Sequence, residues 1–326
     1  MFDLFVEREE NKFGMNNGSP FVSVVIPTFN RISQLKRCLR NIFRLDYPQN
    51  CLEVIVVDNG SRDGTQAYLQ ELQVQRENFK WLRCEKRGRP AAANIGLRHA
   101  KGKLIFSTDD DALVDPDWIN AHLAEYRDET VAVVGGWEHI IIDNLLAIFV
   151  SSRYVDEFAN RIVIEGDAGW NGQAISSMNV SFRREVFDRT GFFDEHFING
   201  ADYDLTSRIL RNQFKIVKNP LIRVTHLKND TMASFIRTHW KRGLGVILYQ
   251  IKHDQLPFRE FIIVLTPKMI REDLQRYRKL TGIDRLGFSK AVKLVGLSIL
   301  SYYVTHVSRL YHYCKIHHRL SKDRPA

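Results

Sequence analysis

Cysteine is scarce in this sequence, and the few cysteines are not paired. Cys38, Cys51, Cys84 and Cys314 are scattered over 326 residues. Zinc sites and disulfide frameworks use cysteines at short, regular spacings, so neither is expected here. A reducing, cytoplasmic setting is the simplest one for such a chain.

Long apolar runs are also missing. The segment from Leu294 to Ser308 contains no Lys, Arg, Asp or Glu, yet it is shorter than the ~20 apolar residues that a membrane-spanning helix needs. The N-terminal residues MFDLFVEREENKFGMNNGS are acidic and polar, so we expect no signal peptide. The sequence therefore favours a protein that does not span the membrane.

A glycine-rich nucleotide loop is absent as well. The first predicted strand runs into PTFNR, not into G-x-G-x-x-G. Dinucleotide oxidoreductases use those glycines to bring the backbone close to a pyrophosphate. Enzymes that form sugar nucleotides usually open with a glycine-rich loop too, so both classes are disfavoured.

Acidic residues are outnumbered by basic ones. The formal net charge is +9 and the isoelectric point is near 9.4, which favours an anionic partner such as a nucleotide phosphate, nucleic acid or a membrane surface. The basic residues are dispersed and no helix-turn-helix or RNA-binding signature is present, so we expect no nucleic-acid partner.

Apolar segments and helical patterns alternate from residue 21 onwards. The predicted strands are FVSVVIP, EVIVVD, FKWLRC, KLIFST and, later, VAVVGG. Between the first four lie segments whose apolar residues recur at helical spacing. Alternating strands and helices predict an α/β fold with a parallel sheet covered on both faces. Ligands bind such sheets beyond the carboxyl ends of the strands.

Three consecutive aspartates, Asp109 to Asp111, follow one of these strands. Adjacent carboxylates repel each other, so the arrangement is costly unless a cation offsets it. Mg²⁺ or Mn²⁺ suits oxygen ligands and accepts substrate phosphates as further ligands. The alternative is a solvated acidic turn that caps a helix.

Several motifs in register resemble the family-2 inverting glycosyltransferases of the GT-A fold. They are VSVVIPTFNR, VIVVDNGSRDGT, GRPAAANIGLRHAKG, IFSTDDDA and GFFDEHFINGADYDL, and together they cover about Val22 to His226. The resemblance implies a Rossmann-like, mostly parallel sheet with helices on both faces and a helical C-terminal extension. It also implies metal-dependent transfer of a sugar from a nucleotide-diphosphate sugar to a hydroxyl group, in cell-surface glycan or polysaccharide assembly.

The resemblance assigns binding roles position by position. The residues matched to nucleotide-sugar binding are Pro27, Thr28, Asn30, Arg31, Asp58, Ser61, Asp63, Arg89, Asn94, Asp109, Asp110 and Asn179. Those matched to the metal are Asp109, Asp111 and His226. Six of these residues have a structural alternative: Asp58 and Asp63 as helix caps, Arg89 as a surface charge, Asn94 and Asn179 as hydrogen-bonded structural residues, and His226 as a structural histidine.

The stretch GADYDL resembles the family's G-E-D-x-D-L motif, whose first aspartate is usually the general base. That residue is Asp202 here, and we hypothesise that it deprotonates the acceptor. Ala201 stands where the family often has glutamate, so an acceptor contact is missing and Asp204 stays open as an alternative base. The same departure would suit a second interpretation, a catalytically inactive relative that binds carbohydrate or nucleotide.

The chain is expected to have three parts: an N-terminal tail (1–20), a GT-A catalytic domain (21–230) and a basic, aromatic helical region (231–326). Expected partners are a nucleotide-diphosphate sugar and a glycan or lipid-linked saccharide acceptor. The apolar segment near residues 290–315, flanked by Lys293, Arg309 and Lys315, suits an interfacial helix at the inner face of the cell membrane. Packing against the catalytic domain or a second subunit is the alternative.

Overall fold

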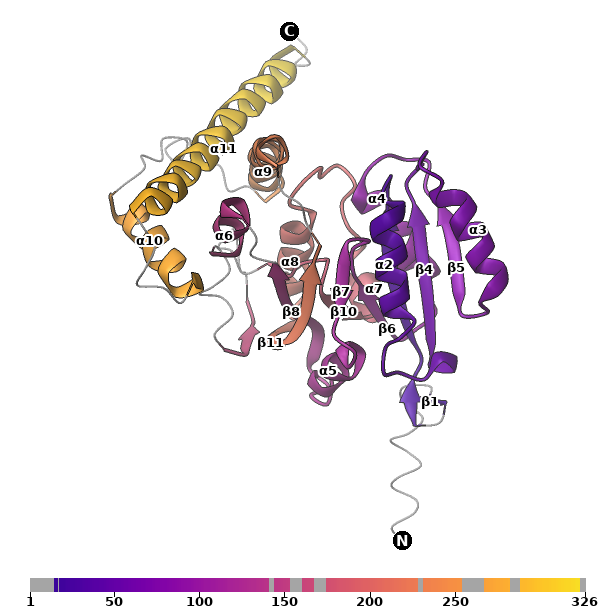
Figure 1. The fold of residues 1–326 in the computed structure, drawn as a ribbon. Helices are drawn as coiled ribbons and strands as arrows, with labels where there is room; N and C mark the ends of the chain where they lie inside the picture. Colours follow the sequence, from indigo (N-terminus) through magenta and orange to yellow (C-terminus); the bar gives the residue numbers. More distant parts are fainter. Residues whose placement is uncertain are drawn as a thin grey trace. The chain divides into compact units, whose positions relative to one another are not determined.

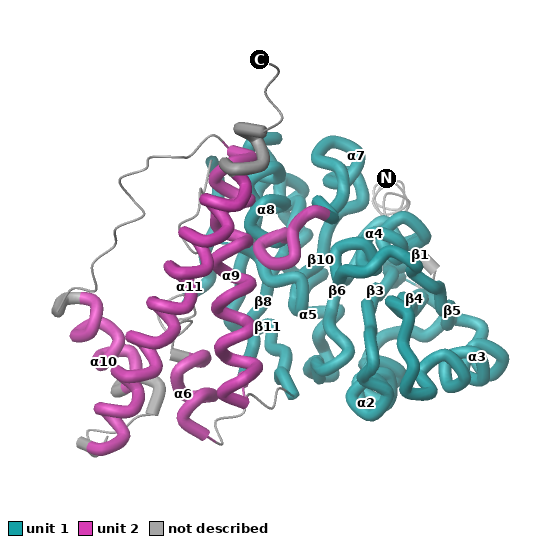
Figure 2. Tube along the Cα trace, turned by 90° about the horizontal axis from the view of Figure 1, so that it is seen from above, with its two compact units in different colours: residues 1–139, 160–195, 202–227 teal, residues 140–159, 196–201, 228–326 magenta. Residues whose placement is uncertain are grey.

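The computed structural model describes residues 15–16, 18–140, 144–152, 160–166, 174–227, 231–253, 267–281 and 288–322. The chain divides into two compact units, which Figure 2 distinguishes by colour. Unit 1 comprises residues 1–139, 160–195 and 202–227, and unit 2 comprises 140–159, 196–201 and 228–326. Each unit is considered separately below.

The first half of unit 1 is a parallel sheet. Strands β3 (Val22–Thr28), β4 (Leu52–Asp58), β5 (Phe79–Arg83) and β6 (Leu104–Ser107) lie in the order β5-β4-β3-β6, and all three pairings are parallel. Helices α2 (Ile32–Ile42), α3 (Thr65–Gln75) and α4 (Arg89–His99) connect them (Figure 1). Valine and isoleucine fill β3 and β4 because both faces of these strands are buried.

The strand order reverses at β3, and this reversal determines which strand ends lie side by side. The chain runs outwards from β3 to β4 to β5, then returns across β3 to form β6. Right-handed crossovers put α2 and α3 on one face and α4 on the other. The carboxyl ends of β3, β4 and β6 therefore lie side by side at a topological switch point.

The second half of the sheet is antiparallel. β10 (Val180–Arg183) pairs antiparallel with β6 and with β8 (Val131–Ile140), and β11 (Lys215–His226) pairs antiparallel with β7 (Ala112–Val114) and β9 (Ile162–Ile164). The predicted α/β class is confirmed. The continuous parallel ladder, however, covers only β5-β4-β3-β6, so the sheet as a whole is mixed.

Shorter elements complete unit 1. The hairpin of β1 (Met15–Asn16) and β2 (Ser19–Pro20) lies in the expected tail. A 3-10 turn, η1 (Gln49–Cys51), precedes β4. The remaining helices are α5 (Trp118–Glu125), α7 (Glu185–Thr190) and α8 (Ala201–Arg211).

Unit 2 is helical in its described part. Helices α9 (Met232–Lys252), α10 (Pro267–Thr281) and α11 (Phe288–Lys322) form the helical C-terminal extension that the sequence predicted, and α6 (Leu145–Ser152), from within the expected catalytic domain, belongs to the same unit. Its core includes Phe149, Phe235, Tyr277 and Leu294. Arg309, expected to flank a membrane-facing helix, is instead buried and donates to Gln250 Oε1 at 3.4 Å. Among the described helices, none is long and apolar enough to cross a membrane.

Candidate active site

Two strand-end loops are tied together at the carboxyl edge of unit 1. Asn30 adopts a left-handed backbone conformation with φ of 51°, which asparagine tolerates better than most residues. Its N–H donates to Ser61 Oγ at 2.8 Å, and its side-chain oxygen accepts from the N–H of Arg62 at 2.7 Å. The loop after β3 is therefore held against the loop after β4.

The two acids of the second loop have different positions. Asp58 is fully buried and accepts hydrogen bonds from Ser61 N at 3.0 Å and Gln66 Nε2 at 3.0 Å. Asp63 accepts from Ile32 N at 2.9 Å and from the Thr65 hydroxyl at 2.6 Å, so it binds both α2 and α3 at their N-termini. Asp63 thus makes contacts of the capping kind.

Each of the three aspartates has a different partner. Asp109 Oδ1 accepts from Arg89 Nε at 3.0 Å. Asp110 accepts from the Thr28 hydroxyl at 2.7 Å and from Arg31 Nη1 at 3.0 Å, and Asp111 Oδ2 accepts from the same Nη1 at 2.7 Å. Arginine side chains therefore offset the crowded carboxylates in this structure.

His226 reaches the same cluster from the end of β11. Its Nε2 lies 3.4 Å from Asp111 Oδ2, and the N–H of Leu227 donates to the Asp111 carbonyl at 2.7 Å. The pairing of β11 with β7, which places His226 opposite Ala112, explains this position. The structure thus brings together residues more than a hundred positions apart.

The pKa values of the neighbouring Asp110 and Asp111 are shifted in opposite directions. Burial raises the pKa of Asp110 to about 6, although Arg31 and Thr28 oppose the rise. Burial also disfavours the charge of Asp111, but the hydrogen bond and charge of His226 outweigh it and hold the pKa of Asp111 below its usual range. Burial lowers the pKa of His226, but the hydrogen bond to Asp111 and the charge of Asp111 outweigh burial and raise it.

The three aspartates and His226 suit a divalent cation that takes some of its ligands from a bound substrate. Asp111 Oδ1 is buried and has no hydrogen-bond partner within the described part of the chain, which leaves one carboxylate oxygen available. Among the described residues, no three His, Cys, Asp or Glu side chains are arranged to hold a metal by themselves. Mg²⁺ and Mn²⁺ commonly use one or two carboxylates and complete their shell with phosphate and water, so the donor set is suitable.

Asp202 and Asp204 differ in accessibility. Asp202, in the first turn of α8, is half-buried and accepts from the Ser177 hydroxyl at 3.1 Å. Burial raises the pKa of Asp202, and the Arg89 charge opposes this rise. Asp204 is completely buried and accepts from Arg208 Nε at 3.0 Å and Nη2 at 2.8 Å.

Glu138 lies beside the candidate site, and the sequence interpretation missed it. Its carboxylate accepts a hydrogen bond from Ser176, the neighbour of the serine that binds Asp202. Burial raises the pKa of Glu138, and the charges of Asp109 and Asp202 raise it further against Ser176 and His226. β8 runs parallel to β6 because β10 is antiparallel to both, so a glutamate just after VAVVGG could have been placed at this edge.

Two of the predicted asparagines are saturated by protein groups. The Asn94 amide donates to the Phe193 carbonyl at 2.8 Å and to Glu195 Oε1 at 2.9 Å. The buried Asn179 donates to the carbonyls of Trp137 and Ile222 and accepts from Trp118 Nε1 at 2.8 Å. These bonds match the structural alternative for both residues. Pro27, the remaining predicted residue, lies within β3 beside Val57.

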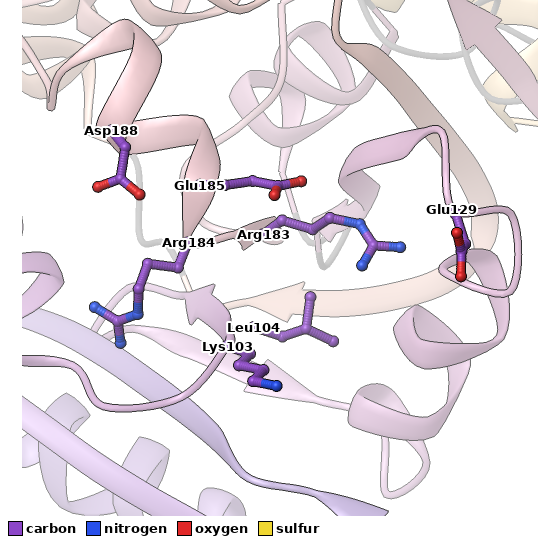
Figure 3. A pocket seen from close by; sticks show the side chains of 7 residues that line it. All are labelled: Lys103, Leu104, Glu129, Arg183, Arg184, Glu185 and Asp188. Atoms are coloured by element: carbon purple, nitrogen blue, oxygen red, sulfur yellow. The ribbon is translucent and has the colours of Figure 1, made fainter. Parts of the chain in front are cut away.

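A separate pocket lies away from this edge. It has a volume of about 420 Å³ and is lined by Lys103, Leu104, Glu129, Arg183, Arg184, Glu185 and Asp188 (Figure 3). Leu104 begins β6, so the pocket is at the opposite end of the strand from the aspartates. Arg183 and Arg184 already donate to the backbone carbonyls of Val131 and Gly102.

The chain is similar in sequence to a known protein family and to several known proteins. The model of the family "Glycosyl transferase family 2" matches residues 23–191. Glycosyltransferase AglE of Haloferax volcanii is 30% identical over 195 residues, which are 60% of this chain and 62% of AglE. A dolichyl N-acetyl-alpha-D-glucosaminyl phosphate 3-beta-D-2,3-diacetamido-2,3-dideoxy-beta-D-glucuronosyltransferase of Methanococcus voltae is 27% identical over 67% of this chain and 70% of its own length.

Solved structures share the fold at low sequence identity. The mannosyltransferase PcManGT from Pyrobaculum calidifontis, in complex with GDP-Man and Mn²⁺, superposes with a TM-score of 0.60 and 19% identity, covering 95% of this chain and 94% of that one. S. aureus TarS 1-349 in complex with UDP-GlcNAc gives a TM-score of 0.54 and 13% identity, with coverage of 88% and 89%.

Proposed function

The chain belongs to glycosyl transferase family 2, and on that premise we propose that it transfers a sugar, with inversion, from a nucleotide-diphosphate sugar to a hydroxyl acceptor. The observation that carries this proposal is the convergence of Asp58, the three aspartates and Asp202 at one sheet edge. Nucleotide ligands bind at such switch points in α/β sheets. The geometry therefore supports a donor and a base side by side.

The donor side is assigned to the loops after β3, β4 and β6. Asp58, Asn30 and Ser61 would contact the base and ribose, and Arg89 with Asp109 would border the diphosphate. A divalent cation would be held by Asp111, with Asp109 and His226 beside it, and would supply charge neutralisation of the diphosphate as it leaves. Arg31 and Arg89 place further positive charge at the same edge, which supports stabilisation of a leaving anion.

Asp202 is our candidate for the general base. It would accept the proton of the acceptor hydroxyl while that oxygen bonds to C1 and the C1–diphosphate bond breaks. The hydrogen bond from Ser177 and the nearby Arg89 favour its ionised form. Asp204, which is buried and paired with Arg208, is a poorer candidate because its charge is already used inside the protein.

Glu138 is our candidate for the acceptor-side carboxylate. Ala201 lacks the acidic side chain common at its position in the family. The consecutive residues Ser176 and Ser177 bind the carboxylates of Glu138 and Asp202, and the two carboxylates are close enough for the charge of Asp202 to act on Glu138, although β8 and α8 are distant in sequence. A carboxylate supplied from β8 would provide an acceptor contact in place of the missing one.

The acceptor is proposed to be a glycan or a lipid-linked saccharide, with no nucleic-acid partner. The Methanococcus relative is named for action on a dolichyl phosphate sugar, which supports the lipid-linked form. The donor-bound neighbours hold GDP-Man with Mn²⁺ or UDP-GlcNAc, which supports Mn²⁺ or Mg²⁺ as the cofactor. We assign catalysis to residues 21–230, at the cytoplasmic face of the membrane, in cell-surface polysaccharide assembly.

An inactive carbohydrate- or nucleotide-binding relative is the second candidate. Ala201 is the feature in its favour. Binding of a donor without any turnover would support it, whereas slow hydrolysis of the bound donor would exclude it.

The test is a panel of UDP-, GDP- and dTDP-sugars with and without Mn²⁺ or Mg²⁺, followed by thermal unfolding and by release of nucleoside diphosphate. One nucleotide class should stabilise the wild type only with metal, and Asp111→Asn should abolish that effect. Asp188→Asn, an exposed aspartate of α7, is the matched control and should behave as wild type. If no nucleotide stabilises the wild type, the donor assignment is wrong.

A further inference from the structure

Helix α11 carries an apolar stripe that is open to solvent. Val292, Tyr303, Val307, Leu310 and Tyr311 are each between 50% and 61% exposed. Their spacing puts them on one side of the helix, within a sector about 100° wide. We call these five residues the α11 stripe. Burial of such side chains is favourable, so a stripe of this length indicates a surface that binds something.

Helix α9 adds a tryptophan to this surface within unit 2. Trp240 is 37% exposed, and its ring lies 5.7 Å from the ring of Tyr311. The two helices meet closely at Gly243, beside Thr305 and Ser308. Tryptophan and tyrosine are the residues that prefer the boundary between water and lipid, because one end of each ring system is apolar and the other is polar.

All the charged side chains of α9 and α11 are basic. Neither helix contains Asp or Glu over its whole length. On α11, Lys290 and Lys293 lie near Val292 at the N-terminal end of the stripe, and Lys315 lies beyond Tyr311 at its C-terminal end. The charged side chains that α9 and α11 place near the stripe are therefore all positive.

We propose that the α11 stripe, together with Trp240, binds the surface of an anionic lipid bilayer. A second copy of the chain is disfavoured as the occupant, because it would bring a like-charged surface against this one. A purely polyanionic partner such as nucleic acid would neutralise the lysines but leave the apolar stripe in water. An anionic bilayer satisfies both features, since the lysines contact headgroups while the stripe enters the acyl boundary. This proposal is independent of the donor chemistry in unit 1.

The test is co-sedimentation of the full chain with vesicles of phosphatidylcholine alone or of equal parts phosphatidylcholine and phosphatidylglycerol. Wild type should bind the anionic vesicles preferentially, and high salt should weaken binding. V307D/L310D should weaken it by at least roughly tenfold, because two apolar side chains no longer enter the lipid. K293Q and K315Q should each weaken it roughly fivefold.

Two controls keep the test independent of folding. V74D/L221D changes exposed apolar residues of unit 1 in the same way and should bind as wild type. In the wild type, lipids brominated in the acyl chain should quench part of the tryptophan fluorescence, and Trp240→Phe should remove that part. Wild type that stays in solution with anionic vesicles, or V307D/L310D that binds as well as wild type, would overturn the proposal. Concentration-dependent self-association that V307D/L310D abolishes would overturn it in favour of a second copy.

Discussion

Asp109, Asp110 and Asp111 are neighbours in sequence but differ in what holds them. Arg89 binds the first, Thr28 and Arg31 the second, and Arg31 with His226 the third. Only Asp111, among the three, has a buried carboxylate oxygen without a hydrogen-bond partner in the described chain. Its side chain is therefore the best placed of the three to accept a metal.

Arg31 should compete with a divalent cation for this carboxylate. Its guanidinium lies 2.7 Å from Asp111 Oδ2, and it is about half exposed, so it can leave the site. We expect Arg31→Gln to bind Mn²⁺ in the absence of donor more tightly than wild type by roughly threefold to tenfold, given the modest free energy of a partly exposed ion pair. Isothermal titration would measure this, with the exposed Arg37→Gln of α2 as control. Equal Mn²⁺ affinity of wild type and Arg31→Gln would contradict the prediction.

Asp202 should govern the acid side of the pH profile. Because burial raises its pKa, the base becomes protonated at a pH above the 3.8 of an ordinary aspartate, and kcat should fall as pH decreases through that higher pKa. Removal of the Ser177 hydrogen bond, which lowers the pKa, should shift the acid limb of Ser177→Ala to still higher pH. Asp202→Asn should lose about 100-fold or more in kcat.

The measurement is kcat against pH for these variants with a saturating donor. Asp204→Asn serves as the comparison for Asp202→Asn: it should mainly lower stability, since it leaves Arg208 with a weaker buried partner. An acid limb that does not move in Ser177→Ala, or full activity in Asp202→Asn, would count against Asp202 as the base.

The crossing of α9 and α11 depends on a glycine. A Cβ atom at Gly243 would lie 2.5 Å from the Thr305 carbonyl oxygen and 2.6 Å from Ser308 Cβ, whereas one at Gly296 would meet nothing within 4 Å. Gly243→Ala should therefore destabilise unit 2 by about 1–3 kcal/mol through overpacking. Gly296→Ala, the matched control in α11, should be neutral or stabilising by up to about 1 kcal/mol, because alanine is the better helix former. Urea unfolding monitored by circular dichroism would compare the two, and equal effects would argue against the close crossing.

The whole chain should unfold in two steps. Unit 1 has its core around β3, β4 and β6, and unit 2 has a separate one around Phe149, Phe235 and Tyr277. A ligand raises the free energy of unfolding only of the unit that binds it, by about 2.7 kcal/mol at a hundredfold excess over Kd. Donor with metal should accordingly shift one calorimetric transition and leave the other in place, while Gly243→Ala should shift the second alone. A single transition that responds to both would show that the units unfold together.

Sequence patterns predicted much of the fold and the edge at which the site lies. Apolar periodicity is local, and so it located β3, β4, β5, β6 and the helices between them. The antiparallel half was not predicted, because the pairings of β10 with β6 and of β11 with β7 join segments far apart in the chain.

By itself, the sequence determined which polar residues follow the strands, because a strand end and its loop are set by neighbouring residues. Tertiary structure alone decided how those residues are used. It buried Asp204 against Arg208 and left Asp202 half-buried, brought Glu138 to the serine beside Asp202, and saturated Asn94 and Asn179 with protein hydrogen bonds. The physical reason is that accessibility, hydrogen-bond partners and pKa depend on contacts between residues distant in sequence, and no local spacing encodes them.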